Sequence, residues 1–247
     1  MSQKNYKMII SYDGTRYFGW EHQPGKDTIQ GKLEAVLEKL SGSYIEVLGA
    51  GRTDAGVHAK GMCAHFSLET ELDAEELRRY FNRYLPEDIA VKQLREASPR
   101  FHARYNATGK TYRYTIYQGE SKPVFDRKFV WTIDEKLDLE AMRAAAGELQ
   151  GQHDFAAFCK AAGKNKSTVR TVDAIDIKAK GEYLQLTFHG DGFLRNMVRI
   201  LTGTLVAVGK GELTPEDVAA ILEEGDRRQA PPTAPAQGLC LIKVDYE

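Results

Sequence analysis

The order of strand-like and helix-like segments constrains the fold of this chain more than any other feature of its sequence. In the first hundred residues, extended runs at 7–14, 44–50, 57–68 and 89–97 are separated by two amphipathic segments with apolar residues at helical spacing. The resulting order, β-α-β-β-α-β, is that of a split ferredoxin-like unit. This half of the chain is therefore predicted to form an α+β domain with an antiparallel sheet.

The two helices of this half carry recognisable start and stop signals. The first is predicted to begin after Asp27, with Gln30 completing a capping box, and to end at Gly42. The second is predicted to begin after Asp73 and to end before Pro86, which cannot continue a helix. Each helix thus has a defined length and one apolar face to bury.

The second half repeats this order with insertions, although no repeat is visible at the level of residues. Its expected elements are a strand at 110–119, a helix from Asp138, a hairpin around Lys180 and Gly181, a helix over 193–208, a short helix between Thr214 and Gly225, and a strand at 239–246. We therefore expect two α+β halves, residues 1–104 and 105–247, that meet near a cleft.

Composition is that of a globular protein and excludes several classes. Of 247 residues, 42% are hydrophobic and 28% charged, and no apolar run approaches the roughly 20 residues that span a bilayer. The opening residues contain only a three-residue apolar run, too short for a signal peptide. The three cysteines are isolated from one another, which is typical of reduced thiols. We expect a cytoplasmic protein.

Positive charge is concentrated in two stretches of an otherwise neutral chain. The formal net charge is −1, which gives no overall indication of nucleic-acid binding. Residues 95–113, however, contain five Lys or Arg against the single acid Glu96, and residues 159–170 contain four and no acid. Such local concentration is what phosphate binding requires, although solvated surfaces also segregate charge.

The stretch GAGRTDAGVHA, residues 49–59, combines a carboxylate, an arginine and three glycines. Glycine permits backbone conformations that other residues avoid, so this loop could present Asp54 at the mouth of a cleft. Arg52 is close enough in sequence to keep the carboxylate ionised and oriented, as a nucleophile or a base requires. Taken by themselves, these residues are better explained by a turn with an Asp–Arg surface pair, because turns favour Asp and Gly.

Two further positions could serve a site. On the predicted helix 193–208, Arg199 and Arg195 flank the apolar stripe, where they face either a neighbouring cleft or solvent. In TYRYTIY, Tyr112 alternates with Arg113 along a strand, a composition that suits a base-stacking platform but also follows from simple β-propensity.

Metal and nucleotide sites are not indicated. His58, Cys63 and His65 are close in sequence, but on a strand His58 points away from the other two, and two ligands do not make a tetrahedral site. No phosphate-binding loop, serine-hydrolase elbow or kinase set occurs. The sequence therefore predicts no metal site.

Taken together, these motifs resemble those of the tRNA pseudouridine synthases of the TruA family. GAGRTDAGVHA is similar to the active-site motif of that family, and further stretches match in family order along about 230 residues. They are YDGTRYFGW (12–20), GKTYRYTI (109–116), KSTVRTV (166–172), NMVRILTG (196–203) and TAPAQGLCLIKVDY (233–246).

The resemblance implies the pseudouridine synthase fold, in which two ferredoxin-like halves share a continuous antiparallel sheet around a basic central cleft. It also implies a homodimer that isomerises uridine to pseudouridine in the tRNA anticodon stem-loop, at positions 38–40, without metal or cofactor. Asp54 matches the catalytic aspartate of the family, Arg52 the arginine of the same motif, Tyr112 the tyrosine that stacks on the target base, and Arg199 the arginine that pairs with the aspartate.

The basic stretches would then hold RNA phosphates, and the candidates are Arg170, Lys164, Lys166 and Arg195. The chain departs from the family pattern at Glu21, where glutamine is common, and at Cys240, where tyrosine is common. These two departures affect the contacts to tRNA rather than the reaction itself.

Two other functions fit parts of the pattern. The same sheets could form an RNA-binding module without catalysis, which would retain tRNA but release no label from uracil C5. A transferase or hydrolase with an aspartyl intermediate would need a phosphate cradle or a second catalytic carboxylate, and the sequence contains neither.

Overall fold

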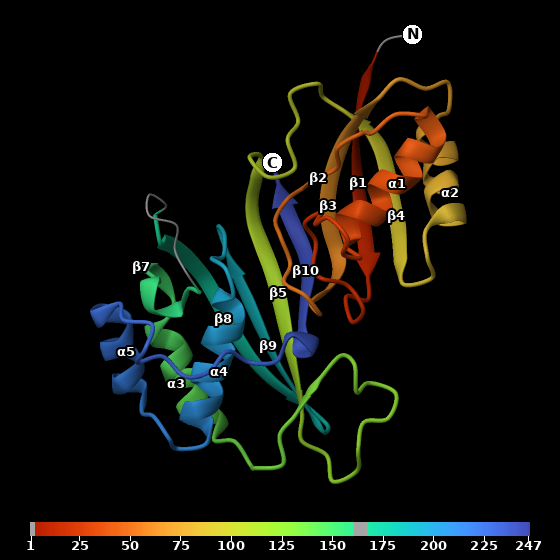
Figure 1. Cartoon of the computed structure of the whole chain (residues 1–247). Coiled ribbons are helices and arrows are strands. Elements are labelled where there is room, and N and C mark those ends of the chain that lie inside the picture. Colours follow the sequence, from red (N-terminus) through yellow and green to blue (C-terminus); the bar gives the residue numbers. More distant parts are fainter. Residues whose placement is uncertain (1–2, 161–166) are drawn as a thin grey trace. The chain divides into compact units, whose positions relative to one another are not determined.

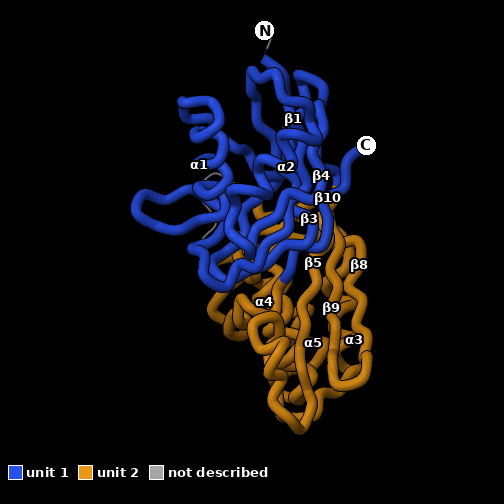
Figure 2. Tube along the Cα trace, turned by 90° about the vertical axis from the view of Figure 1, so that its right-hand side faces the viewer, with its two compact units in different colours: residues 1–108, 240–247 blue, residues 109–239 orange. Residues whose placement is uncertain are grey.

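The computed structural model describes residues 3–160 and 167–247, which form two compact units (Figure 2). Unit 1 comprises residues 1–108 together with 240–247, and unit 2 comprises residues 109–239. The boundary was expected between residues 104 and 105, and the observed division differs from that expectation mainly in the placement of one strand. The last strand of the chain returns to unit 1 instead of staying with the second half.

Unit 1 contains a sheet in the order β4-β1-β3-β10, with β2 beside part of β3 (Figure 1). Three of its pairings are antiparallel, as expected, but β10 joins β3 in parallel, so the sheet is mixed. The helices α1 and α2 lie next to each other against this sheet (Figure 1). The elements are β1 (Lys4–Tyr12), α1 (Ile29–Ser41), β2 (Leu48–Gly49), β3 (His58–Leu68), α2 (Ala74–Tyr84), β4 (Ile89–Ala97) and β10 (Leu239–Tyr246).

The helix ends of unit 1 are set by local capping. For α2, Asp73 and Glu76 form a reciprocal capping box, which confirms the predicted start. For α1, the N-cap is Thr28, whose hydroxyl accepts a hydrogen bond from the N–H of Gly31, so the prediction of Asp27 as the cap is wrong. Asp27 forms an ion pair with Lys32 instead.

Unit 2 contains the antiparallel sheet β5-β9-β8-β7, with the short strand β6 parallel to β5. The predicted hairpin is confirmed: β8 and β9 are joined at Gly181, which has a positive φ of 59°. The elements are β5 (Ala107–Tyr117), β6 (Trp131–Thr132), α3 (Leu139–Glu148), β7 (Gly151–Asp154), β8 (Val169–Lys180), β9 (Tyr183–Gly190), α4 (Met197–Gly209) and α5 (Pro215–Glu224), with single 3-10 turns at Ala156–Phe158 and Ala236–Gly238.

The helix α4 is the core element of unit 2. It begins at Met197 rather than at 193, because Asn196 adopts a left-handed conformation with φ of 61° and leaves the preceding residues in a loop. Twelve of its thirteen residues are buried, and the exception is Arg199. A helix that is buried all round belongs to a core, so Arg199 is held by a rigid element.

No helix within residues 3–160 and 167–247 combines the length and the apolar character needed to cross a membrane.

The close approach of α4 to the segment 232–234 should depend on Gly203. A Cβ at this position would lie 2.2 Å from the carbonyl oxygen of Pro232, so we expect Gly203→Ala to lower the free energy of unfolding by about 1–3 kcal/mol in urea titrations. Gly147→Ala in α3, where a Cβ meets nothing within 4 Å, should instead raise it by about 0.5–1 kcal/mol. Equal effects of the two changes would contradict this account.

Candidate active site in the Asp54 loop

The loop that carries Asp54 lies between β2 and β3 and packs against the segment 12–20. The backbone N–H of Trp20 donates to the carbonyl oxygen of Thr53 at 3.0 Å, and the hydroxyls of Tyr12 and Thr53 lie 2.9 Å apart. Thr53 itself is buried, whereas Asp54 is only half-buried. The carboxylate is thus carried next to a fixed residue and retains access to solvent.

Glycines allow the two segments to approach at backbone distance. A Cβ at Gly14 would lie 2.0 Å from the carbonyl oxygen of Val57, and one at Gly19 would lie 2.6 Å from that of Thr53. Directly after Asp54 the chain turns back, with the N–H of Val57 bonded to the carbonyl of Asp54 at 3.1 Å and Gly56 at φ of 79°. A positive φ at this third position is what a type II turn requires.

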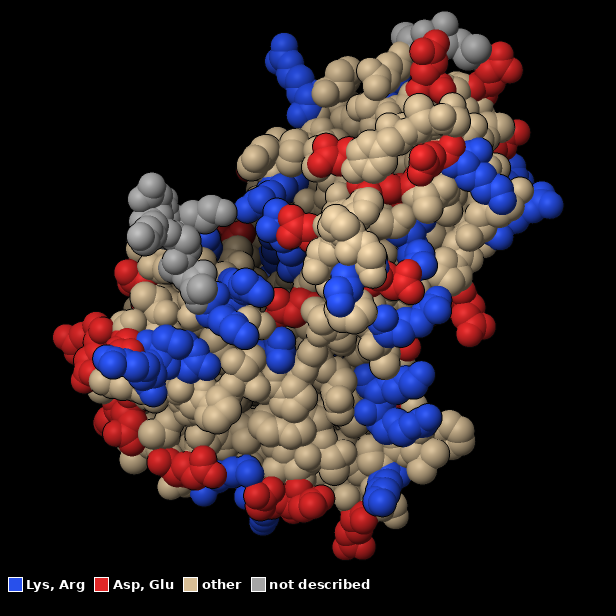
Figure 3. All heavy atoms as spheres, in the orientation of Figure 1, with Lys and Arg blue, Asp and Glu red and all other residues tan. Residues whose placement is uncertain are grey.

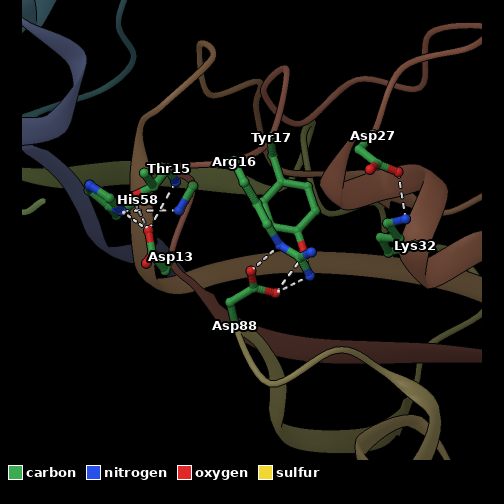
Figure 4. A network of polar contacts seen from close by, with 9 residues as sticks. Asp13, Thr15, Arg16, Tyr17, Asp27, Lys32, His58 and Asp88 are labelled. Carbon is green, nitrogen blue, oxygen red and sulfur yellow. Dashed lines mark hydrogen bonds and ion pairs between the residues drawn. The ribbon is translucent and has the colours of Figure 1, made fainter.

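The segment 12–20 is itself fixed to the start of β4 by Asp88 (Figure 4). The carboxylate of Asp88 accepts hydrogen bonds from Arg16 at 2.5 and 3.1 Å and from the hydroxyl of Tyr17 at 2.6 Å. Burial alone would raise the pKa of Asp88, but these hydrogen bonds hold it below its ordinary value. The segment that supports the Asp54 loop is therefore held by an ionised carboxylate.

A second contact ties the turn after β1 to the first residue of β3. The ring nitrogen Nδ1 of His58 accepts the backbone N–H of Gly14 at 3.0 Å, and Asp13 lies 3.2 Å from the same atom (Figure 4). Asp13 also accepts the N–H of Thr15 at 2.9 Å. His58 has a structural role here, because its ring nitrogen is engaged by the backbone of the supporting segment.

Arg52, predicted to orient Asp54, forms an ion pair with Glu21 at 2.5 Å. Both side chains are substantially exposed. Glu21 directly follows the supporting segment, and it is one of the two positions where the sequence departs from the family pattern. The sequence contains both residues, but only the fold shows that they meet.

In unit 2, Tyr112 lies on β5 opposite Phe188 of β9 and is mostly buried. Its ring meets that of Phe193 edge to face, with the centroids 5.3 Å apart. Tyr112 is therefore held in a defined position by its neighbours in unit 2, and Phe193 is its partner from the loop before α4.

Arg199 is fastened to the segment that leads into β10. Its Nε donates to the carbonyl oxygen of Ala234 at 2.8 Å, and the N–H of Ala234 donates back to the carbonyl of Arg199 at 3.1 Å. Next to it, the hydroxyl of Tyr114 donates to the carbonyl of Pro235 at 2.8 Å. Burial raises the pKa of Tyr114, against the opposing effect of the Arg199 charge. Two of the predicted motifs, 196–203 and 233–246, thus meet at Arg199.

Of the four predicted phosphate-binding residues, the structure describes Arg170 and Arg195. Burial raises the pKa of the Cys159 thiol, and a hydrogen bond with the backbone of Arg195 together with the charges of Arg170 and Arg195 opposes that shift. The backbone N–H of Lys160 also donates to the carbonyl of Arg195 at 3.1 Å. Lys164 and Lys166 lie outside the described residues. Figure 3 shows basic and acidic side chains interspersed on one face of each unit.

The side chains considered for a metal site have separate partners. His65 accepts the backbone N–H of Ala103 at 3.2 Å, whereas His58 is engaged at the other end of β3. In the part of the chain that the structure describes, no three His, Cys, Asp or Glu side chains are grouped as metal ligands.

Comparisons with known proteins identify the family to which the chain belongs. The model of the tRNA pseudouridine synthase family matches residues 8–106 and 145–247, which include the Asp54 loop, its supporting segment and Arg199. The chain belongs to the tRNA pseudouridine synthase family. It is 47% identical to the tRNA pseudouridine synthase A of Syntrophotalea carbinolica over 97% of this chain and 95% of that protein. The corresponding protein of Geobacter sulfurreducens is 46% identical over 98% of this chain and its whole own length.

A third relative, the tRNA pseudouridine synthase A 2 of Clostridium perfringens, is 42% identical over 98% of this chain and 100% of that protein. The protein is accordingly an isomerase of the tRNA pseudouridine synthase family, and the expectation of enzymatic activity is confirmed. A binding module without catalysis and an aspartyl transferase are thereby set aside.

In this synthase, the position of the Asp54 loop should be sensitive to the size of residue 19. Gly19→Ala should lower kcat on tRNA by roughly tenfold or more, because the added methyl displaces Thr53 and with it the neighbouring Asp54. Gly25→Ala is the matched control, since Gly25 also has a positive φ but a Cβ there meets nothing within 4 Å. Equal losses in both variants would mean that backbone strain, not loop displacement, is responsible.

Proposed function

We propose that this synthase converts uridine to pseudouridine in the anticodon stem-loop of tRNA, with Asp54 as the nucleophile. The observation that supports this most directly is the construction of the Asp54 loop. The loop is fixed through Thr53 and Val57 to a segment that Asp88 anchors, while Asp54 itself keeps access to solvent. A nucleophile needs this combination of a fixed backbone and a reachable carboxylate.

The reaction needs no group beyond those of the protein and the RNA. The C1′–N1 glycosidic bond breaks, the uracil turns, C5 bonds to C1′, and the hydrogen of C5 leaves as a proton while N1 takes up a proton from solvent, so the atoms of uridine and pseudouridine are the same. No electrons are exchanged with an external carrier. The Asp54 carboxylate has two electrophilic carbons to attack, C1′ of the ribose and C6 of the uracil, and both routes use the same ionised carboxylate.

The other predicted site residues also have roles in the proposed reaction. The target uridine has to leave its base stack to reach a carboxylate, at a cost of a few kcal/mol, and stacking on Tyr112 would offset part of that cost. Arg199, on its rigid helix, is proposed as a catalytic arginine, and Arg52 would contact the RNA near the target. Arg170 and Arg195 would bind phosphates, as would Lys164 and Lys166, and the enzyme would act as a homodimer.

The nucleophile assignment is tested by Asp54→Asn, which keeps the size of the side chain but removes the charge. Turnover should fall by at least roughly four orders of magnitude, since the covalent step is lost, while the Kd for tRNA changes little. Release of tritium from tRNA labelled at uracil C5 measures turnover. Asp27→Asn, at an exposed aspartate paired with Lys32, serves as the control and should release label normally. Normal release from Asp54→Asn would refute the assignment.

The Arg52–Glu21 ion pair gives a separate prediction. An RNA phosphate that binds Arg52 has to compete with the Glu21 carboxylate, so Glu21→Gln should lower the Kd for tRNA by roughly two- to fivefold. The gain should shrink as salt is raised, because surface charges are screened. Glu38→Gln removes the same charge from an exposed position on α1 and should leave the Kd unchanged. A Kd that does not respond to Glu21→Gln would remove Arg52 from the RNA contacts.

A further inference from the structure

The loop between β4 and β5 displays an aromatic ring that the reaction scheme does not use. Tyr105 is 78% exposed. One face of its ring stacks on His102, with centroids 4.1 Å apart and an interplanar angle of 30°. The other face is free to take a flat partner. An aromatic side chain supported from one side and open on the other is the arrangement that stacks bases in RNA-binding proteins.

The supporting ring of His102 is fixed by its own loop. Its Nδ1 accepts the backbone N–H groups of Arg104 at 3.1 Å and Tyr105 at 3.3 Å. Asn106 closes the turn, because its Oδ1 accepts the N–H of His102 at 2.7 Å and its own N–H donates to the carbonyl of His102 at 3.0 Å. The two stacked rings are therefore organised before any ligand arrives, which reduces the entropy cost of binding.

The stack continues inward to the sheet of unit 1. The ring of His65, on β3, lies 4.6 Å from that of His102 and approaches Phe101 edge to face. The hydroxyl of Tyr246, on β10, donates to the carbonyl of Ala103 at 2.7 Å. These contacts join the loop to two strands, so the exposed ring of Tyr105 is the outer end of a packed structure.

The loop and the residues beneath it also carry positive charge. The ammonium of Lys7 lies 3.6 Å from the ring centroid of Tyr246 and 4.7 Å from that of Phe101. Arg100 and Arg104 are exposed on the loop itself, and residues 97–106 contain no acid. An exposed aromatic ring on a loop that carries two exposed arginines suits a base with its phosphates, whereas a protein-docking patch would present contiguous apolar surface.

We propose that Tyr105 stacks on a nucleobase of the bound tRNA other than the target uridine. This inference rests on the proposed function only in taking tRNA as the ligand. The loop packs on His65, seven residues along β3 from His58, and that length of strand spans about 23 Å. Asp54 precedes His58 by four residues. A base on Tyr105 is therefore a separate nucleotide, and the contact acts on tRNA affinity rather than on the chemical step.

Steady-state kinetics on tRNA test whether Tyr105 affects tRNA affinity or the chemical step. Tyr105→Ala should raise KM by roughly 5- to 100-fold and leave kcat at saturation unchanged, because a lost base stack weakens binding alone. Tyr105→Phe retains the ring and should behave as the wild type. Phe125→Ala is the matched control, since Phe125 is 92% exposed on a loop of unit 2 without a stacked ring beneath it. An unchanged KM in Tyr105→Ala, or an equal rise in Phe125→Ala, would overturn the proposal.

Photocrosslinking identifies the contact directly. Catalytically inactive Asp54→Asn, bound to tRNA that carries 5-iodouridine, should crosslink at Tyr105, and mass spectrometry of the peptide would locate it. Crosslinks that leave residues 98–106 unlabelled would contradict the proposal. So would a Tyr105→Ala variant that changes the oligomeric state by size-exclusion chromatography while its Kd for tRNA stays constant, since the ring would then be a protein contact.

The outcomes separate this inference from the proposed function. If Asp54→Asn still releases label while Tyr105→Ala raises KM, the nucleophile assignment fails and the stacking platform stands. If Asp54→Asn is inactive while Tyr105→Ala keeps its KM, the platform alone fails.

Discussion

The Asp54 loop depends on a backbone contact between two segments that are distant in sequence. Gly14 and Gly19 let the segment 12–20 approach the carbonyls of Val57 and Thr53 at distances that no other residue permits. The hydrogen bond from Trp20 to Thr53 then fixes the residue before Asp54. The backbone of the neighbouring residues therefore holds the loop in place, while Asp54 itself is half-buried.

In unit 2, Arg199 is also held in place by the backbone of a neighbouring segment. Arg199 is a charged side chain on a helix that is otherwise entirely buried, and such a charge is costly unless its donors are satisfied. The carbonyl of Ala234 accepts from its Nε, and Gly203 allows the segment around Pro232 to lie against the helix one turn further on. The motif at 233–246, which has no catalytic side chain, is thus explained as the support of a charged one.

The sequence predicted the elements well because their signals are local. Strands β4 and β10, the Asp73 capping box and the turn at Gly181 follow from periodicity and capping within a few residues. The predicted helix starts were wrong where a nearby residue gave a competing signal for the N-terminal end of the helix. Thr28 rather than Asp27 caps α1, and the left-handed Asn196 delays the start of α4.

The sequence could not predict which residues far apart in the chain would contact each other. Asp88 is unremarkable after Pro86, yet it anchors Arg16 and Tyr17, 72 and 71 residues away. Glu21 was visible only as a departure from a family pattern, and the fold makes it the partner of Arg52. Pairings of this kind depend on sheet register, since β1 must lie between β3 and β4 before the segment that follows it can reach both the Asp54 loop and Asp88. The order of the strands therefore determines which distant segments meet at the Asp54 loop.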